Sequence, residues 1–293
     1  MDLQQLRYVV EVAATSSFTR AAERCFVTQS ALSHQIAALE RELGQRLFVR
    51  SSRSVRLTEA GEAFVVPART AVLAAEQAKE DAAAAVGDVV GTLRLGVIPT
   101  VTAVDVPALL LAYRSAHPSA RVELRVGNSD SLMAAIRRGG LDAALLGLRE
   151  EVQPTGVASR LLASDHLVAV VPSAHALAEA ASVGIRDLAG MTFADFPAGT
   201  SGRAQSDAAF AAAEVERDVA FEADSAELIL GLVAAGLAVT LLAPGVVARA
   251  KADVVTVDLH RGPVRNEYVA WDAAAPRSVA RAFLSVLAGH EPR

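Results

Sequence analysis

Between residues 28 and 57, a short amphipathic helix is followed at once by two brief apolar runs that flank an arginine-rich turn. Apolar residues spaced at i, i+4, i+7 and i+11 predict a helix with one buried stripe. The residues of this stripe are Leu32, Ile36, Leu39 and Leu43. Gly44 predicts the end of the helix. Functional residues are therefore expected on the opposite, polar side of this helix.

Two further helices are predicted before this one. The apolar residues of the first recur at three- and four-residue spacing, as Leu3, Leu6, Val10 and Ala13. Ser17 is a suitable N-cap for a second helix over residues 18–25, and Thr28 is a suitable N-cap for the third. The pattern thus predicts two short helices, the second and the third, joined by a tight turn at residues 26–27.

The polar side of the third helix carries small or hydrogen-bonding side chains. They are Ser30, Ser33, His34, Ala37 and Arg41, with Thr28 and Gln29 at the N-terminal end. Such side chains allow a helix to enter the major groove of DNA without steric conflict. The alternative is the solvated surface of an ordinary helical bundle.

The segment after the third helix favours the DNA-binding alternative. Residues 47–50 and 55–57 are predicted to form two short strands around a polar turn. Five arginines and a single acid, Glu42, occur from Arg41 to Leu57. Residues 1–60 hold eight arginines and six acids, a net charge of +2, which leaves −7 for the rest of a chain whose total is −5. Positive charge therefore collects where a helix and a wing would meet a duplex.

Phosphate contacts and base contacts are expected from different side chains. Arginines grip phosphates, which reads no sequence, and Arg53 at the wing tip could enter a minor groove. Gln29, Ser33 and His34 are better placed to meet base edges. The candidate DNA-binding residues are Thr28, Gln29, Ser30, Ser33, His34, Arg50 and Arg53.

Five segments in this order carry a resemblance to a known family. They are Phe-Thr-Arg-Ala-Ala-Glu-Arg at 18–24, Val-Thr-Gln-Ser-Ala-Leu-Ser-His-Gln-Ile at 27–36, Leu-Glu-Arg-Glu-Leu-Gly at 39–44, Leu-Phe-Val-Arg at 47–50 and Leu-Thr-Glu-Ala-Gly at 57–61. Together they resemble the DNA-binding domain of LysR-type transcriptional regulators. The resemblance implies a winged helix-turn-helix that binds double-stranded DNA at an interrupted inverted repeat, as a homodimer or homotetramer, and contact with RNA polymerase that an effector controls.

A long helix is predicted from Glu59 onward, with two acids, Glu59 and Glu62, in its first turn. Its spacing of four and three predicts a coiled-coil seam of Phe64, Ala68, Ala71, Ala75, Ala78 and Ala82. The alternative is an alanine-rich helix that lies on its own domain. Pro67 is expected to kink the helix, and Gly87 and Gly91 mark its exit. By resemblance this is the linker helix through which the family dimerises.

From Thr92 onward apolar strand-like runs alternate with helical ones, which predicts an α/β domain. A second set of strands and helices begins near residue 163, and the chain returns through residues 265–271 to a final helix. The resemblance implies two lobes with two chain crossings, as in periplasmic binding proteins of type 2. The expected fold is α/β overall: an all-α winged helix-turn-helix (1–58), a linker helix (59–88) and an effector domain (91–293) with lobe I at about 91–162 and 267–293 and lobe II at about 163–266.

In such folds a ligand sits at strand ends and helix N-termini, where free backbone donors and hydroxyls can hold an anion. The candidate effector-binding residues are Thr100, Thr102, Ser129, Phe196, Thr200, Ser201 and Arg203. Each has an alternative role. Thr100, Thr102 and Ser129 could serve as caps or turns, Phe196 could pack in lobe II, and Arg203 could pair with an acidic neighbour instead of an anionic effector.

Several other functions lack their residues in the sequence. The histidines are scattered without the spacing of a metal site, and no Ser, His and acid constellation suggests hydrolysis. We therefore expect no cofactor, no metal and no enzymatic activity. Cys25, the single cysteine, is expected to pack in the helix-turn-helix, and the apolar runs are interrupted by Gly or Pro, which predicts a cytoplasmic protein without membrane insertion. The competing hypothesis is a solute-binding or enzymatic α/β protein with an unrelated helical N-terminus.

Overall fold

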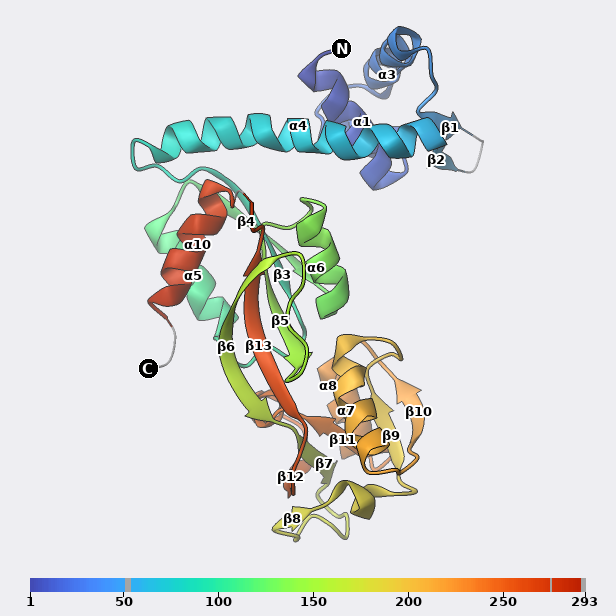
Figure 1. The fold of residues 1–293 in the computed structure, drawn as a ribbon, viewed down its shortest axis with the longest axis vertical. Coiled ribbons are helices and arrows are strands. Elements are labelled where there is room, and N and C mark those ends of the chain that lie inside the picture. Colours follow the sequence, from blue (N-terminus) through green and yellow to red (C-terminus); the bar gives the residue numbers. More distant parts are fainter. Residues whose placement is uncertain (51–53, 275, 291–293) are drawn as a thin grey trace. The chain divides into compact units, whose positions relative to one another are not determined.

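Figure 1 shows a computed structural model of the chain, which describes residues 1–50, 54–274 and 276–290 and forms two units, Met1–Gly87 and Asp88–Arg293. The first unit begins with α1 (Leu3–Thr15), α2 (Phe18–Arg24) and α3 (Gln29–Leu43). Each helix starts at a side chain that accepts a backbone N–H, from Asp2, Ser17 and Thr28 respectively. The second and third helices therefore begin where Ser17 and Thr28 predict.

The core of the first unit lies between α1 and α3. Val9, Val12, Leu32, Ile36 and Leu39 are buried there. The fourth residue of the predicted stripe does not follow this pattern, because Leu43 is 37% exposed. It occupies the last turn of α3, where the helix ends at the left-handed Gly44 and extends past the packing partners. Strands β1 (Phe48–Arg50) and β2 (Val55–Leu57) then pair as an antiparallel hairpin.

The long helix α4 (Glu59–Ala84) runs without interruption through Pro67. Its first half packs on α1, where Ala68 and Val72 form a small cluster with Leu6. Ala71, Ala78 and Ala82 are exposed. The predicted seam is thus divided: Phe64 and Ala68 at its N-terminal end pack on their own unit, which was the alternative, and small exposed side chains occur from Ala71 onward.

Lobe I of the second unit is a five-stranded sheet with helices on both faces. Its strand order is β4-β3-β5-β13-β6, with β13 antiparallel to both neighbours. Figure 1 shows α5 and α10 together on one face and α6 on the other. The elements are β3 (Gly91–Val97), α5 (Val106–Ala116), β4 (Ala120–Val126), α6 (Ser129–Arg137), β5 (Ala143–Arg149), β6 (Ala158–His166), β13 (Val264–Trp271) and α10 (Ser278–Ala288).

Lobe II has a core of its own, separate from that of lobe I. A four-stranded sheet of order β11-β7-β12-β8 is joined to the pair β10-β9 by a bridge between Phe193 and Val239. The elements are β7 (Val168–Pro172), β8 (Ser182–Val183), the 3-10 helix η1 (Ile185–Leu188), β9 (Thr192–Asp195), α7 (Ser201–Ala212), β10 (Asp218–Glu222), α8 (Ala226–Ala234), β11 (Thr240–Leu242), α9 (Pro244–Arg249) and β12 (Val254–Leu259).

The chain crosses between the lobes twice, from β6 to β7 and from β12 to β13. The two crossings lie side by side, because the Leu167 amide donates to the Pro263 carbonyl at 2.9 Å and Val264 pairs with His166. The α/β fold with two lobes and two crossings is therefore confirmed.

Candidate nucleic-acid interface and effector cavity

The N-terminal part of α3 presents a polar face to solvent. Gln29, Ser30 and His34 are exposed, and Ser33 is half-buried. Leu32 and Ile36, on the opposite side, are fully buried and hold the helix on the core. Within the described residues the side chains of Gln29 and His34 have no hydrogen-bond partner, so both are free to meet a ligand.

Thr28 holds the N-terminus of α3 in place. Its hydroxyl accepts the Ala31 amide at 3.2 Å and lies 3.2 Å from the Ser30 hydroxyl. An N-cap satisfies one of the free donors of the first turn, and its loss costs about 1 kcal/mol of helix stability. Thr28 therefore orients the helix that it begins, whatever contact it also makes outside the protein.

Arg50 at the end of β1 folds back over the recognition face. Its guanidinium donates to the Ser33 hydroxyl at 2.8 Å and stacks 3.8 Å from the centre of the Phe18 ring. These contacts link the hairpin to α2 and α3, so Arg50 and Ser33 form a single feature. Arg53 lies outside the described residues.

The hairpin is fixed to α3 by one carboxylate. Glu40 accepts the backbone amides of Leu47 and Phe48 at 2.8 and 3.2 Å. Phe48 in turn packs edge-on against Phe18, with ring centres 5.6 Å apart. Helix and wing are thus held in one orientation, which a rigid DNA-binding surface requires.

A cavity of about 330 Å³ lies between the two lobes of the second unit. Its wall comes from the loop after β3, the starts of α6 and α7, and strands of both lobes. Five of the seven candidate effector-binding residues line it: Thr100, Ser129, Phe196, Thr200 and Ser201. Thr102 and Arg203 are not among the lining residues.

Two of the lining residues have structural roles as well. The Ser129 hydroxyl donates to the Gly147 carbonyl at 2.9 Å and accepts the Gly147 amide at 3.0 Å, so it ties α6 to β5. The Thr200 hydroxyl caps α7 by accepting the Arg203 amide, and it donates to the Pro197 carbonyl. The hydroxyls of Thr100 and Ser201 have no such partner within the described part of the chain.

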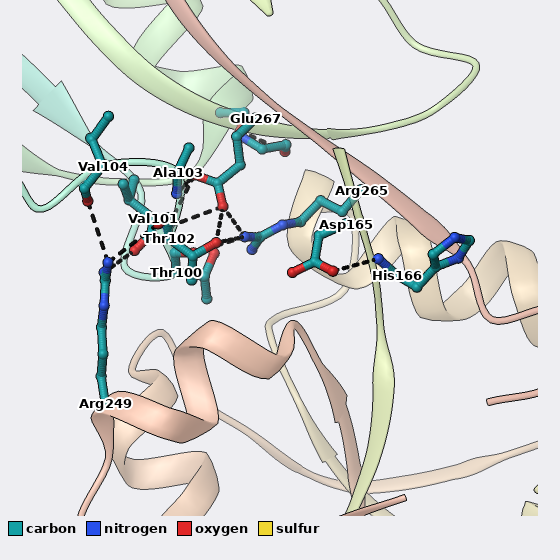
Figure 2. Close-up of polar contacts among 12 residues, drawn as sticks. Thr100, Val101, Thr102, Ala103, Val104, Asp165, His166, Arg249, Arg265 and Glu267 are labelled. Atoms are coloured by element: carbon teal, nitrogen blue, oxygen red, sulfur yellow. Dashed lines mark hydrogen bonds and ion pairs between the residues drawn. The ribbon is translucent and has the colours of Figure 1, made fainter. Parts of the chain in front are cut away.

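Thr102 belongs to a buried polar cluster beside the cavity (Figure 2). Its hydroxyl donates to the Glu267 carboxylate at 2.5 Å, and its amide donates to the same group. Arg265, also on β13, pairs with Glu267 and donates to the Thr100 carbonyl at 3.0 Å. The cluster fixes the loop after β3 onto the strand that crosses between the lobes.

Arg203 points to acidic neighbours instead of the cavity. Its guanidinium donates to Asp207 and Glu222, both at 3.0 Å. Burial alone lowers the pKa of Arg203, but these hydrogen bonds and charges outweigh it and raise the pKa above its ordinary value. Asp195 in the same network is held by Arg217 at 2.6 Å, although burial still raises the pKa of Asp195 above its usual range. These contacts favour the pairing role among the two alternatives for Arg203.

The structure adds three residues that the sequence analysis did not single out. Arg265 and Gln205 are each 3% exposed and line the cavity, and Asp224 lines it from an exposed position. The Arg265 Nε is buried without a partner in the part that the structure describes. Two signals were present in the sequence: an arginine at the start of the segment 265–271 through which the chain returns, and Gln205 one helical turn after Ser201.

An arginine of lobe II also holds the loop after β3 in lobe I by hydrogen bonds (Figure 2). Arg249, the last residue of α9, donates to the carbonyls of Val101 at 2.6 Å, Thr102 at 3.3 Å and Val104 at 3.4 Å. The loop after β3 is therefore held by β13 through Glu267 and by α9 through Arg249.

The described residues contain no cluster of His, Cys, Asp and Glu that could hold a metal ion. Across the same ranges, no helix is both long and apolar enough to cross a membrane.

Comparison with known families decides between the two hypotheses. Residues 3–62 match the family described as bacterial regulatory helix-turn-helix protein, lysR family, and residues 87–291 match the LysR substrate binding domain. The chain belongs to the LysR family of transcriptional regulators. The resemblance given by the sequence is thereby confirmed, and a solute-binding or enzymatic protein with an unrelated N-terminus is not favoured.

Individual LysR relatives span most or all of the chain. The transcriptional dual regulator GltC of Bacillus subtilis is 34% identical over 245 residues, 83% of this chain and 80% of its own. The regulator ShiR of Corynebacterium glutamicum is 31% identical over 98% of each chain. A full-length OxyR variant from Pseudomonas aeruginosa has a TM-score of 0.75 with 28% identity, covering 100% of this chain and 98% of that one. CbnR bound to its target DNA has a TM-score of 0.69 with 25% identity, covering 99% and 100%.

Proposed function

We propose that this LysR-type regulator reads an interrupted inverted repeat through the exposed face of α3, as a homo-oligomer in the cytoplasm, and that a small anionic effector in the interlobe cavity controls its contact with RNA polymerase. The observation that carries the DNA-binding part is the exposed polar face at the start of α3. Gln29 and His34 are exposed on a helix whose other side is buried, beside a hairpin that is fixed by Glu40.

The roles of the candidate DNA-binding residues differ. Gln29 and His34 supply amide and imidazole groups for base edges in the major groove. Ser30 and Thr28 lie at the positive end of the helix, which suits a phosphate oxygen. Arg50 stacks on Phe18 and bonds Ser33, so its charge sits at the junction of helix and wing, where it would neutralise phosphate.

Two recognition helices are needed because one buries little surface, and a dimer places them in successive major grooves. Residues 71–82 of α4 support this proposal, since Ala71, Ala78 and Ala82 are exposed and small enough for close helix packing. A tetramer requires a second surface. Lobe I offers exposed leucines for one, Leu111 on α5 and Leu124 on the edge strand β4, which are 69% and 52% exposed.

Fluorescence anisotropy with a duplex from the promoter beside the regulator's own gene tests base reading. Gln29→Ala and His34→Ala should each weaken binding to this duplex by roughly 1–3 kcal/mol while leaving binding to unrelated DNA unchanged. Gln4→Ala, an exposed glutamine on α1, is the matched control and should change neither. Equal losses for both duplexes would contradict base reading by α3.

The salt dependence of the same assay tests phosphate contact. Arg50→Ala should lower the slope of log affinity against log salt by about 0.9 for a single phosphate contact. Arg138→Ala, an exposed arginine in the second unit, should leave the slope unchanged. An unchanged slope for Arg50→Ala would remove this residue from the interface.

The anionic character of the effector rests on the cavity wall. Two helices, α6 and α7, begin at the cavity and direct their positive ends toward it. The buried Arg265 adds a guanidinium whose Nε lacks a partner within the described residues. Gln205 and the hydroxyls of Thr100 and Ser201 supply neutral hydrogen bonds, and apolar side chains such as Ile98 and Leu241 complete the wall. Such a wall suits a carboxylate with an apolar body.

Calorimetric titration of the full chain with acetate, benzoate, succinate and glutamate tests this. At least one carboxylate should bind, and Gln205→Leu and Thr100→Val should each weaken that binding about tenfold, the effect of roughly 1.4 kcal/mol. Thr256→Val, an exposed threonine on β12 outside the cavity, is the control. If Thr256→Val weakens binding as much as Thr100→Val, the anion does not occupy this cavity.

A further inference from the structure

A second groove, of about 640 Å³, lies on the other part of α7 from the effector cavity. It is formed by the end of β5, the start of η1, the middle and C-terminal half of α7 and the turn between β12 and β13. Both lobes therefore contribute to it. We call it the arginine groove, because Arg149, Arg186 and Arg261 line it together with His260.

The charge of the arginine groove is not balanced locally. Glu151 is the one acid among its lining residues, against three arginines. Within the part of the chain that the structure describes, the side chains of Arg149, Arg186 and Arg261 take part in no ion pair and no hydrogen bond. The groove thus concentrates free positive charge in a region of the chain, residues 61–293, whose net charge is negative.

Other arginines of the same unit behave differently. Arg203, Arg217 and Arg277 are largely buried, and each pairs with an aspartate within 3.0 Å. An unpaired guanidinium at the surface is ordinary when it stands alone. Here three unpaired guanidinium groups, from three separate elements, line one groove. Each of them can bind a carboxylate or a phosphate with two hydrogen bonds, so together they form a suitable anion site.

Small apolar side chains form another part of the wall of the arginine groove. Ala208, Ala209 and Ala212 on α7 line it with methyl groups, which leaves room beside the guanidinium groups. Gln205 lines both this groove and the effector cavity, so one helix forms part of both walls. A ligand in the groove would therefore contact the helix that closes the effector cavity.

We propose that the arginine groove is a second ligand site, for a small molecule that carries two or more anionic oxygen groups, such as a phosphorylated metabolite or a polycarboxylate. The site is distinct from the interlobe effector cavity and does not depend on the identity of the effector. Three guanidinium groups against one carboxylate match a multivalent anion better than a single charge, because a lone carboxylate leaves two of the forks unpaired.

Calorimetric titration of the full chain with pyrophosphate and, separately, with citrate at constant ionic strength tests the proposal and distinguishes the two chemistries. At least one probe should bind with one site per chain. The double variant Arg149→Gln, Arg261→Gln should lose at least tenfold in affinity. The double variant Arg121→Gln, Arg138→Gln removes the same charge from exposed positions outside the groove and should bind as the wild type does.

Three results would overturn the proposal. One is equal loss in both double variants, which would mean general electrostatic attraction. Another is a lowered salt slope of DNA binding in Arg149→Gln, Arg261→Gln, which would make the groove part of the DNA interface. Failure of pyrophosphate and citrate to bind the wild type would also reject it, while the promoter assay of Gln29→Ala stands independently of all three.

Discussion

Gly61, in the first turn of α4, lies so close to the backbone just before β1 that a side chain does not fit there. A Cβ added there would lie 2.1 Å from the carbonyl oxygen of Leu47, a backbone atom that cannot move without displacing β1. Thr58, the N-cap of the same helix, also holds this region by donating to the Arg46 carbonyl at 2.6 Å. The run Leu-Thr-Glu-Ala-Gly at residues 57–61 thus allows α4 to pack closely against the hairpin.

We predict that Gly61→Ala destabilises the protein by roughly 1–3 kcal/mol, the usual cost of overpacking. It should also weaken DNA binding, because β1 and the wing must shift. Thermal unfolding and promoter anisotropy measure the two effects. Gly231→Ala is the matched control, since Gly231 lies in α8 with no atom within 4 Å of an added Cβ. Equal stability of the two variants would contradict the role assigned to Gly61.

Cys25 is expected to be a slow nucleophile. Burial, and after it the negative charge of Glu11, raise the pKa of the Cys25 thiol above its usual value, so the thiolate fraction at a given pH falls. Alkylation by iodoacetamide at pH 8 should therefore be slower in the folded chain than in the chain unfolded by urea. Mass spectrometry measures both rates. Equal rates would show that the helix-turn-helix does not protect this thiol.

At this scale the sequence predicted caps and buried stripes well, because these depend on near neighbours. Ser17 and Thr28 cap the helices that follow them, as predicted. Long-range pairings were not predictable. Glu267 accepts from Thr102, 165 positions away in the sequence, and Arg203 bonds Glu222 only because β10 lies beside the start of α7.

Helix α9 contacts lobe I through its last residue, Arg249. Arg249 donates to three carbonyls of the loop after β3, so it holds lobe II to lobe I without any ligand. A bound effector stabilises the closed lobes only by its differential affinity for that state. We therefore expect the contacts of Arg249 to increase effector affinity, because they favour the closed state before the effector binds.

We predict that Arg249→Ala weakens effector binding up to roughly tenfold, which corresponds to about 1.4 kcal/mol of lost preference for closure. Amide hydrogen exchange in residues 101–104 should become faster, because the loop loses one of its two attachments. Lys251→Ala, an exposed residue two positions later, is the control for charge. Unchanged exchange in this loop would show that Glu267 alone holds it.

Elements with strong periodicity were predictable and short ones were not. The first three helices, the hairpin and the long helix follow from apolar spacing and Gly44, and all of them occur in the structure. The sequence did not predict α9, η1, β8 or β9, because these elements have two to six residues each, too few for a periodic pattern. For the same reason, the contacts of Arg249 with the loop after β3 could not be predicted, since Arg249 ends one of these short elements.

At the scale of the whole molecule, two sets of exposed apolar residues indicate how copies of the chain assemble. One is the alanine face at residues 71–82 of α4, and the other is the pair Leu111 and Leu124 in lobe I. An edge strand such as β4 with exposed apolar side chains invites association unless it is covered. Each set serves a different interface in the proposed tetramer, so each can be removed separately.

We predict that Leu111→Glu with Leu124→Glu converts a tetramer into dimers that still bind one inverted repeat, because the α4 seam is intact. Ala78→Glu with Ala82→Glu should instead yield chains that lose binding to the full repeat, since two recognition helices are no longer joined and like charges meet across the seam. Light scattering gives the mass of each variant, and anisotropy with a full site and a half-site gives its DNA binding. Dimers in both variants, with equal affinity for the full site, would show that α4 does not pair the recognition helices.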